Sequence, residues 1–131
     1  MNILVIGYSS IARRKIIPAL LEMGGFNIDI ASQSSTKKDA ISNDKLNKFY
    51  SNYDEALNST NSNLVYISVI NSLHSDLVLK SLSLGKHVIV DKPAFLTLKT
   101  AEIMVDLAKK KHLLLAEATV FCYHDAFKRI T

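Results

Sequence analysis

A lysine stands between an aspartate and a proline in Asp91-Lys92-Pro93, and these residue types could do chemistry. An ammonium group in a crevice can donate a proton to a carbonyl oxygen or stabilise a developing alkoxide. Asp91 could orient the lysine, and Pro93 fixes the exit of the chain. A surface ion pair followed by a turn proline has the same sequence, so the tripeptide alone leaves both interpretations open.

A second candidate site is Gly7-Tyr8-Ser9-Ser10-Ile11-Ala12, which follows a short apolar run. Dinucleotide-binding turns have the pattern Gly-x-Gly-x-x-Gly or Gly-x-Gly-x-x-Ala. Gly7 and Ala12 keep the first and third positions, and Ser9 replaces the second glycine, where backbone approaches the pyrophosphate. The Ser9 hydroxyl could bond a phosphate oxygen, and the helix N-terminus favours an anion. A strand, turn and helix without any ligand would also fit this pattern.

The residues after the second predicted strand bear on the type of cofactor. An acid there would accept the ribose 2′-hydroxyl of NAD. The chain instead has Ser32-Gln33-Ser34-Ser35-Thr36-Lys37-Lys38, whose hydroxyls and lysines suit a 2′-phosphate. The sequence therefore favours NADP(H) over NAD(H). Asp29 lies inside the strand and is either a polar side chain of a peripheral strand or a displaced ribose acceptor.

The hydrophobic periodicity predicts alternating strands and helices around these sites. Strands are expected at 3–6, 26–31, 64–70, 87–90 and 113–117, with a short one near 48–50, and helices at 10–23, 36–46, 74–84 and 97–110, with a helical turn at 53–57. Right-handed βαβ crossovers then give an α/β fold, a doubly wound parallel sheet with helices on both faces. Ligands of such sheets bind beyond the carboxyl ends of the strands, where the candidate residues lie.

Two helices carry more detailed expectations. Pro18 lies inside the first helix, so we expect a kink near 14–17 or a helix that begins late. Thr97 is a candidate N-cap for the helix at 97–110. An apolar stripe on that helix has the spacing of one buried face and consists of Ala101, Met104, Val105 and Ala108.

Composition narrows the class of protein. The 131 residues predict one globular domain, and the net charge of +4 comes from scattered basic groups that favour solvated helix faces over a nucleic-acid surface. No apolar stretch approaches the roughly 20 residues of a membrane span. The single Cys122 and the absence of a leader predict a cytoplasmic protein. Cys122 and His124 are too few for a metal site.

Two longer stretches carry a family resemblance. Residues 64–74, Leu-Val-Tyr-Ile-Ser-Val-Ile-Asn-Ser-Leu-His, and 85–93, Gly-Lys-His-Val-Ile-Val-Asp-Lys-Pro, resemble the N-terminal NAD(P)-binding domain of the glucose–fructose oxidoreductase / inositol dehydrogenase (Gfo/Idh/MocA) family. That family has Thr-Pro-Asn with a histidine three residues on, and then Glu-Lys-Pro. Val69-Ile70 replaces Thr-Pro and Asp91 replaces the glutamate. The tail from Glu117 to His124 is also similar, and residues 11–20 resemble the branch that reduces keto groups of nucleotide-linked sugars.

The resemblance implies a Rossmann-type domain and a role for each candidate residue. The pyrophosphate would contact Gly7, Tyr8, Ser9, Ser10 and Ile11. The adenosine ribose or its phosphate would contact Ser32 together with Ser34 or Lys37. The nicotinamide end would contact Val69, Asn71, His74, Asp91 and Lys92. Lys92 would be catalytic, acting on a sugar oxygen during hydride transfer. His74 could equally be a structural residue at a helix N-terminus. The branch often has a Ser-Arg pair after the second strand, of which Ser32-Gln33 keeps only the serine.

Length is the main departure from the family. Family members continue into a substrate-binding and dimerisation domain, whereas this sequence stops at Thr131. We therefore expect this chain to be the cofactor-binding domain of an oxidoreductase that acts on a sugar, nucleotide sugar or cyclitol. We expect it to be inactive without the second domain, and assembly into a homo-oligomer is a further expectation. The chain would be an excised piece, a truncated gene product or half of a split protein. The alternatives are a non-catalytic NAD(P)-sensing module and a structural α/β domain that binds nothing.

Overall fold

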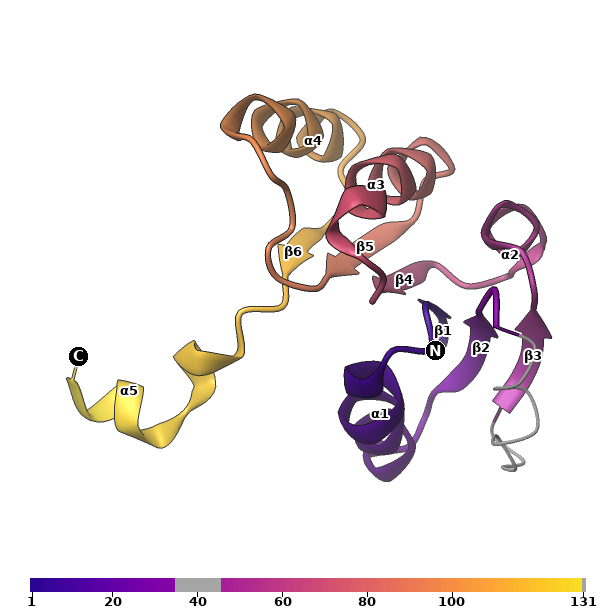
Figure 1. Ribbon diagram of the computed structural model, residues 1–131, viewed down its shortest axis with the longest axis horizontal. Coiled ribbons are helices and arrows are strands. Elements are labelled where there is room, and N and C mark those ends of the chain that lie inside the picture. Colours follow the sequence, from indigo (N-terminus) through magenta and orange to yellow (C-terminus); the bar gives the residue numbers. More distant parts are fainter. Residues whose placement is uncertain (35–45, 131) are drawn as a thin grey trace.

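The computed structural model describes residues 1–34 and 46–130 and contains one parallel sheet of six strands. The strands lie in the order β3-β2-β1-β4-β5-β6 (Figure 1). The chain therefore winds outward in one direction from β1 to β3 and in the other from β4 to β6, which places the switch point between β1 and β4. The strands are β1 Asn2–Ile6, β2 Asn27–Ala31, β3 Leu46–Tyr50, β4 Leu64–Ile67, β5 His87–Val90 and β6 Leu115–Glu117.

Helices cover both faces of the sheet, as the sequence predicts. Helix α1, Ile17–Met23, lies on one face, and α2, Tyr53–Ser59, α3, His74–Ser83, and α4, Leu98–Lys110, lie on the other (Figure 1). Successive residues of β1 enter opposite cores, because strand side chains alternate: Ile3 and Val5 pack on the α1 side, and Leu4 and Ile6 on the other. Burial on both faces explains why β1 is a continuous apolar run. The doubly wound Rossmann-type fold is thus confirmed.

The first helical segment begins irregularly, as Pro18 predicts. A π-helical turn spans Ala12–Ile16 and passes into α1 at Ile17, with Pro18 in the first turn of α1. Pro18 has no N–H to donate to the carbonyl four residues earlier. The Ile17 N–H instead bonds the Ala12 carbonyl, five residues back. The expected disturbance near 14–17 is therefore a π-turn.

The helix at 97–110 forms as expected. Thr97 is its N-cap and accepts a hydrogen bond from the Thr100 amide. Met104 and Ala108 are buried, whereas Val105 at the edge of the predicted stripe is 39% exposed. The stripe is therefore narrower than its spacing suggests.

Other predicted boundaries were wrong by a few residues. The strand expected at 64–70 ends at Ile67, and the strand at 113–117 begins at Leu115. The short strand near 48–50 exists and begins at Leu46. Leu46 was expected to end the helix at 36–46 and is a strand residue instead. The part of that helix at 36–45 lies outside the described residues.

The C-terminal residues lie away from the sheet. A 3₁₀ turn at Val120–Tyr123 leads into α5, Asp125–Ile130, which projects away from the other helices (Figure 1). Phe121 and Phe127 contact each other edge to face with ring centroids 5.2 Å apart. Within residues 1–34 and 46–130, no helix combines the length and apolarity needed to cross a membrane.

Candidate functional site

Gly7 ends β1 in a conformation that only glycine accommodates here. Its φ is +92°, and its amide donates to the Ala31 carbonyl at 2.8 Å. A Cβ at this position would overlap the Ser68 carbonyl oxygen and crowd the Val69 side chain. The turn therefore passes directly against the end of β4, at the switch point of the sheet. The positive φ of Gly7 permits the tight turn that the first glycine of a dinucleotide-binding pattern provides.

Ser9 replaces the second glycine of the pattern and caps the helical segment that follows. Its hydroxyl oxygen accepts a hydrogen bond from the Ala12 amide at 3.0 Å, and its carbonyl accepts one from the Arg13 amide at 2.9 Å. The helix N-terminus begins at the carboxyl end of β1, where its first-turn amides carry partial positive charge. The turn thus has the form of an anion-binding site although one glycine is missing.

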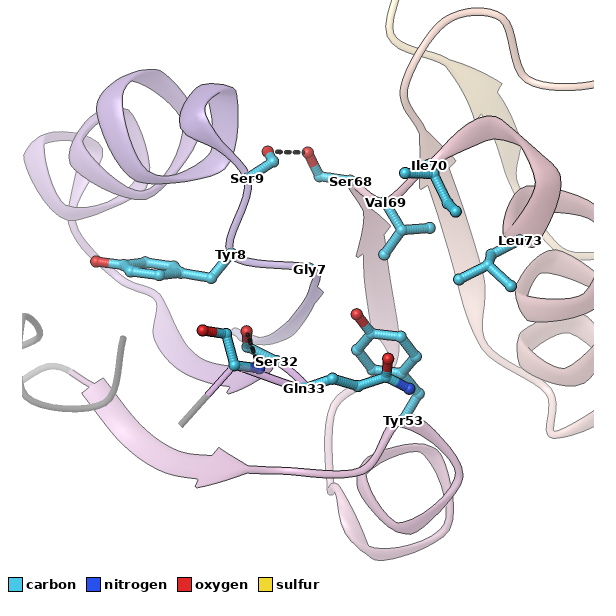
Figure 2. Close-up of a pocket in the computed structure, with 11 residues that line it drawn as sticks. Gly7, Tyr8, Ser9, Ser32, Gln33, Tyr53, Ser68, Val69, Ile70 and Leu73 are labelled. Atoms are coloured by element: carbon cyan, nitrogen blue, oxygen red, sulfur yellow. Dashed lines mark hydrogen bonds between the residues drawn. The ribbon is translucent and has the colours of Figure 1, made fainter. Parts of the chain in front are cut away.

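A cavity of about 460 Å³ opens beside this turn (Figure 2). Of the sequence-predicted residues, those that line it are Gly7, Tyr8, Ser9, Ser32, Ser34 and Val69. Gln33, Ile70 and Leu73 also line it and belong to the stretches 32–35 and 69–74, where the sequence predicts that a ligand binds, although no role was assigned to them. Tyr53 and Ser68 line it as well and were missed from sequence. Tyr53 comes shortly after the strand predicted near 48–50, which was an available signal. Ser68 directly follows β4 in the structure but lay inside the strand predicted at 64–70, so no such signal was available for it.

A second cavity, of about 420 Å³, has no lining residue in common with the first. Ile11, Asp91 and Lys92, all predicted from sequence, line it together. Lys15, Ile16, Tyr66, Ala118 and Val120 complete the wall. Lys92 is exposed to solvent and has no ion pair within the part of the chain that the structure describes. A free ammonium group at the mouth of an apolar cavity can serve a ligand oxygen.

Asp91 does not bond Lys92, contrary to the expectation that it orients the lysine. One carboxylate oxygen accepts the Tyr66 hydroxyl and the other accepts the Ser68 hydroxyl at 2.6 Å. Burial and the hydrogen bond to Asp91 raise the pKa of Tyr66, which keeps that hydroxyl a donor. The Asp91 carboxylate is therefore bonded to Tyr66 in β4 and to Ser68 directly after β4, and not to Lys92.

The carboxylate of Glu117 experiences the positive charge of Lys92. Its two oxygens accept the Ala94 amide at 2.9 Å and the Thr119 hydroxyl at 2.8 Å. These hydrogen bonds and, more weakly, the Lys92 charge lower the pKa of Glu117. Glu117 thus binds the backbone two residues after Lys92. From the sequence, Glu117 belongs to the tail that resembles the family, and no role is predicted for it.

His74 is buried completely. Its Nδ1 lies 2.9 Å from the Pro93 carbonyl oxygen and its Nε2 lies 3.0 Å from the Val69 carbonyl oxygen. The ring thus connects Val69, which follows β4, to Pro93, which follows Lys92. Between the two roles left open by the sequence, this geometry favours the structural one.

The residues directly after β2 form part of the wall of the first cavity. The Ser32 hydroxyl accepts the Ser34 amide at 3.3 Å, and burial raises the pKa of Tyr53 while a hydrogen bond from the Gln33 backbone opposes the shift. Asp29 is buried within β2, where its carboxylate accepts the Thr60 hydroxyl at 2.6 Å. Asp29 does not line the cavity, so the geometry favours its structural interpretation.

Two further predicted residues lie outside both cavities. Ser10 and Asn71 are exposed and line neither of the two cavities. Lys37 lies outside the described residues.

Comparison with known proteins agrees with this geometry. The family model described as "Oxidoreductase family, NAD-binding Rossmann fold", Gfo/Idh/MocA, matches residues 1–119. The chain belongs to this family. It is an NAD(P)-binding Rossmann domain of the oxidoreductase class, as the sequence resemblance predicts.

Relatives within the Gfo/Idh/MocA family include two named sugar reductases. The chain is 31% identical to the 1,5-anhydro-D-fructose reductase of Ensifer adhaerens, over 85% of this chain and 34% of that protein. It is 32% identical to the dTDP-3,4-didehydro-2,6-dideoxy-alpha-D-glucose 3-reductase of Streptomyces violaceoruber, over 99% of this chain and 38% of that protein. The chain therefore spans little more than a third of the length of these relatives.

A solved structure in the family has the same fold over nearly the whole chain. The 3-ketoreductase KijD10 from Actinomadura kijaniata, in complex with NADP and TDP-benzene, superposes with a TM-score of 0.91 at 26% identity. The match covers 99% of this chain and 40% of KijD10.

Proposed function

We propose that this chain is the cofactor-binding part of an NADP(H)-dependent oxidoreductase that acts on a keto or hydroxyl group of a sugar, nucleotide sugar or cyclitol. The observation that carries the proposal is the pair of cavities that share the Gly7–Ile11 segment in their walls, with Gly7 and Ser9 in the first and Ile11 and Lys92 in the second. The sugar reductases among the relatives support the substrate class. A separate substrate-binding domain completes the active site in this proposal.

In the proposed binding mode the dinucleotide crosses the turn. The adenosine half lies in the cavity beside Ser32 and Ser34, the nicotinamide half lies in the cavity beside Asp91 and Lys92, and the pyrophosphate meets the amides after Ser9. Gly7 supports this mode, because a side chain there would block the close approach of the two strands.

The preference for NADP(H) is part of the proposal. Ser32, Gln33 and Ser34 follow the end of β2 and line the first cavity, and among residues 1–34 and 46–130 no carboxylate lines it to accept a ribose 2′-hydroxyl. Hydroxyl and amide groups are compatible with a 2′-phosphate, whereas a carboxylate would repel it. The NADP held by KijD10, at 26% identity, supports the same choice.

Lys92 is the proposed catalytic residue. When bound, the nicotinamide supplies or accepts the hydride. The Lys92 ammonium stabilises negative charge on the substrate oxygen and transfers a proton to it in reduction. Glu117 fixes the backbone after Lys92 through the Ala94 amide, which limits where the ammonium can reach. Ile11, Ile16, Ala118 and Val120 give this cavity apolar walls that reduce the water around the reacting oxygen.

Titration of the chain with NADPH and NADH tests the proposal. The fluorescence of the reduced nicotinamide reports binding directly. We expect NADPH to bind at least roughly tenfold more tightly than NADH, the worth of about one charge-assisted contact. If neither nucleotide binds at millimolar concentration, the proposal is wrong.

The catalytic role of Lys92 requires a protein that also contains the substrate domain. There, Lys92→Ala should lower kcat by a factor of roughly 10² to 10⁴ and leave NADPH affinity nearly unchanged. Equal losses of turnover and affinity would contradict this role. A non-catalytic sensing module would need no lysine after β5, so Lys92 argues against that alternative. Assembly into a homo-oligomer and a cytosolic location stay predictions from sequence.

A further inference from the structure

Four polar side chains connect the two cavities. The Ser9 and Ser68 hydroxyl oxygens are 2.5 Å apart, Ser68 donates to Asp91 at 2.6 Å, and Tyr66 donates to the other oxygen of Asp91. Ser9 and Ser68 line the first cavity, and Tyr66 and Asp91 line the second. We call Ser9, Ser68, Asp91 and Tyr66 the hydroxyl network. It lies at the switch point, directly below the turn that a dinucleotide would cross.

The hydrogen bonds of the network have one direction. A hydroxyl has a single proton to donate. Ser68 donates its proton to Asp91, so the short contact between the serines is a donation from Ser9 to Ser68. Ser9 also accepts the Ala12 amide. Its proton is therefore already used, and a phosphate oxygen at the turn would meet backbone amides rather than the Ser9 hydroxyl, in contrast to the expectation from sequence.

The position of the Ser9 side chain explains how a serine fits where the pattern has glycine. Glycine allows the pyrophosphate to approach because it has no side chain. Figure 2 shows the Ser9 hydroxyl reaching across to Ser68 at the end of β4. Without that partner, rotation about the Cα–Cβ bond would let the hydroxyl point into the space above the turn.

We propose that Ser68, Asp91 and Tyr66 are positioning residues that hold Ser9 aside and fix the turn for the pyrophosphate. The inference rests on the proposed cofactor function and adds to it. Asp91 then acts on the pyrophosphate turn as well as lining the cavity of the nicotinamide half. The hydrogen bond between Ser9 and Ser68 keeps the space above the turn open, as the missing glycine would. Restoring that glycine by Ser9→Gly removes a helix cap and a hydrogen bond, so the reversion does not tighten NADPH binding.

The test compares two ligands that differ in whether they reach the turn. NADPH crosses it, whereas adenosine 2′-monophosphate fills the first cavity and has no pyrophosphate. Ser68→Ala should weaken NADPH binding by roughly three- to tenfold, the worth of one hydrogen bond. It should weaken adenosine 2′-monophosphate binding clearly less, because the Ser68 hydroxyl, although in the wall of the first cavity, is already bonded to Ser9 and Asp91. Ser81→Ala is the matched control, because Ser81 is also a buried serine and its hydroxyl donates to the Leu77 carbonyl within α3.

Tyr66→Phe is the second variant and keeps the ring that packs against β1. It removes the hydrogen bond that Tyr66 donates to Asp91, and it should weaken NADPH binding more than adenosine 2′-monophosphate binding. The variant also provides a test if Ser68→Ala does not fold. A double-mutant cycle with Ser9→Gly and Ser68→Ala should show coupling, so that the double variant binds NADPH little worse than either single one.

The outcomes separate the two levels of the proposal. If the wild-type chain binds neither ligand, the cofactor function and this inference both fail. If NADPH binds but Ser68→Ala and Tyr66→Phe leave its affinity within twofold, or weaken both ligands equally, the cofactor function stands and the positioning role is overturned. Selective loss of NADPH affinity with an unchanged Ser81→Ala control supports it.

Discussion

Gly7 has the most restrictive environment of the candidate site residues. Gly7→Ala introduces both a positive φ for a residue with a side chain and an overlap with the Ser68 carbonyl oxygen. We expect a loss of more than about 2 kcal/mol in the free energy of unfolding, together with loss of NADPH binding. Urea unfolding and nucleotide titration measure the two effects.

Gly24→Ala is the matched control for this substitution. Gly24 also has a positive φ, of +71°, but a Cβ there would meet nothing within 4 Å. Only the backbone strain applies, which is roughly 1–3 kcal/mol for a residue at φ +71° and ψ 172°, and cofactor binding should not change. Equal destabilisation by the two substitutions would show that the close approach to β4 is unimportant.

Glu117 should make the stability of the folded chain depend on pH. Hydrogen bonds from Ala94 and Thr119 lower its pKa in the folded chain. A carboxyl group with a lowered pKa contributes stability above its ordinary pKa, and the contribution is lost as the pH falls through the folded value. Glu117→Gln should therefore destabilise the chain near neutral pH and make less difference at about pH 3. Urea unfolding at several pH values checks this; a difference that grows on acidification would contradict it.

At the residue scale, sequence identified several polar groups of the site but not how they pair. Asp91 and Lys92 are adjacent in the chain, which suggested that they interact. Asp91 instead bonds Ser68 and Tyr66, which are more than twenty residues earlier in the sequence and on or just beyond the neighbouring strand β4. Such partners depend on the register of two strands, and spacing along one strand carries no information about it.

At the scale of elements, α4 depends on its N-cap. Thr97→Ala removes the oxygen that accepts the Thr100 amide and should cost about 1 kcal/mol. Thr97→Ser keeps that oxygen and should retain most of the stability. Thermal or urea unfolding of the two variants measures the difference, and indistinguishable variants would mean that the cap contributes nothing.

Two tyrosines in the sheet should differ in how the stability of the chain responds to loss of the hydroxyl. Tyr66 donates to Asp91, whereas the buried Tyr50 hydroxyl has no hydrogen-bond partner among the residues that the structure describes. Tyr66→Phe should destabilise the chain by about 1–2 kcal/mol, and Tyr50→Phe should be neutral or stabilise it, because an unsatisfied buried hydroxyl is costly. Urea unfolding of both variants tests the pair; similar losses would contradict the assignment.

Element types were easier to predict from sequence than element ends. β1 and β5 are apolar runs, and their existence follows from burial on a parallel sheet. The end of β4 was wrong because Val69 and Ile70 have good strand propensity, while the chain leaves the sheet after Ile67 to form the turn beside Gly7. Local propensity favours a strand there, and the geometry of the site overrides it.

At the scale of the whole molecule, one sheet joins two separate cores. Ser9 begins the segment that packs with the core on the α1 side, and Val69 packs against the core on the other. A ligand across the switch point contacts residues from both halves of the sheet. NADPH at about one hundred times its Kd should therefore stabilise the whole chain by about 2.7 kcal/mol in a single unfolding transition.

The segment after Thr119 contributes little to that transition. Val120, Phe121, Tyr123 and Ile130 are 58–82% exposed, and α5 packs against the 3₁₀ turn that precedes it rather than into either core. Removing residues 120–131 should change the free energy of unfolding by less than about 0.5 kcal/mol, because little apolar surface is lost from either core.

The same truncation should still affect one ligand. Val120 forms part of the wall of the cavity that contains Lys92, so NADPH should bind more weakly while adenosine 2′-monophosphate binds as before. Urea unfolding and the two titrations measure these effects separately. A large loss of stability would show that the segment is part of the folded unit, and equal weakening of both ligands would show that the two cavities do not divide the cofactor between them.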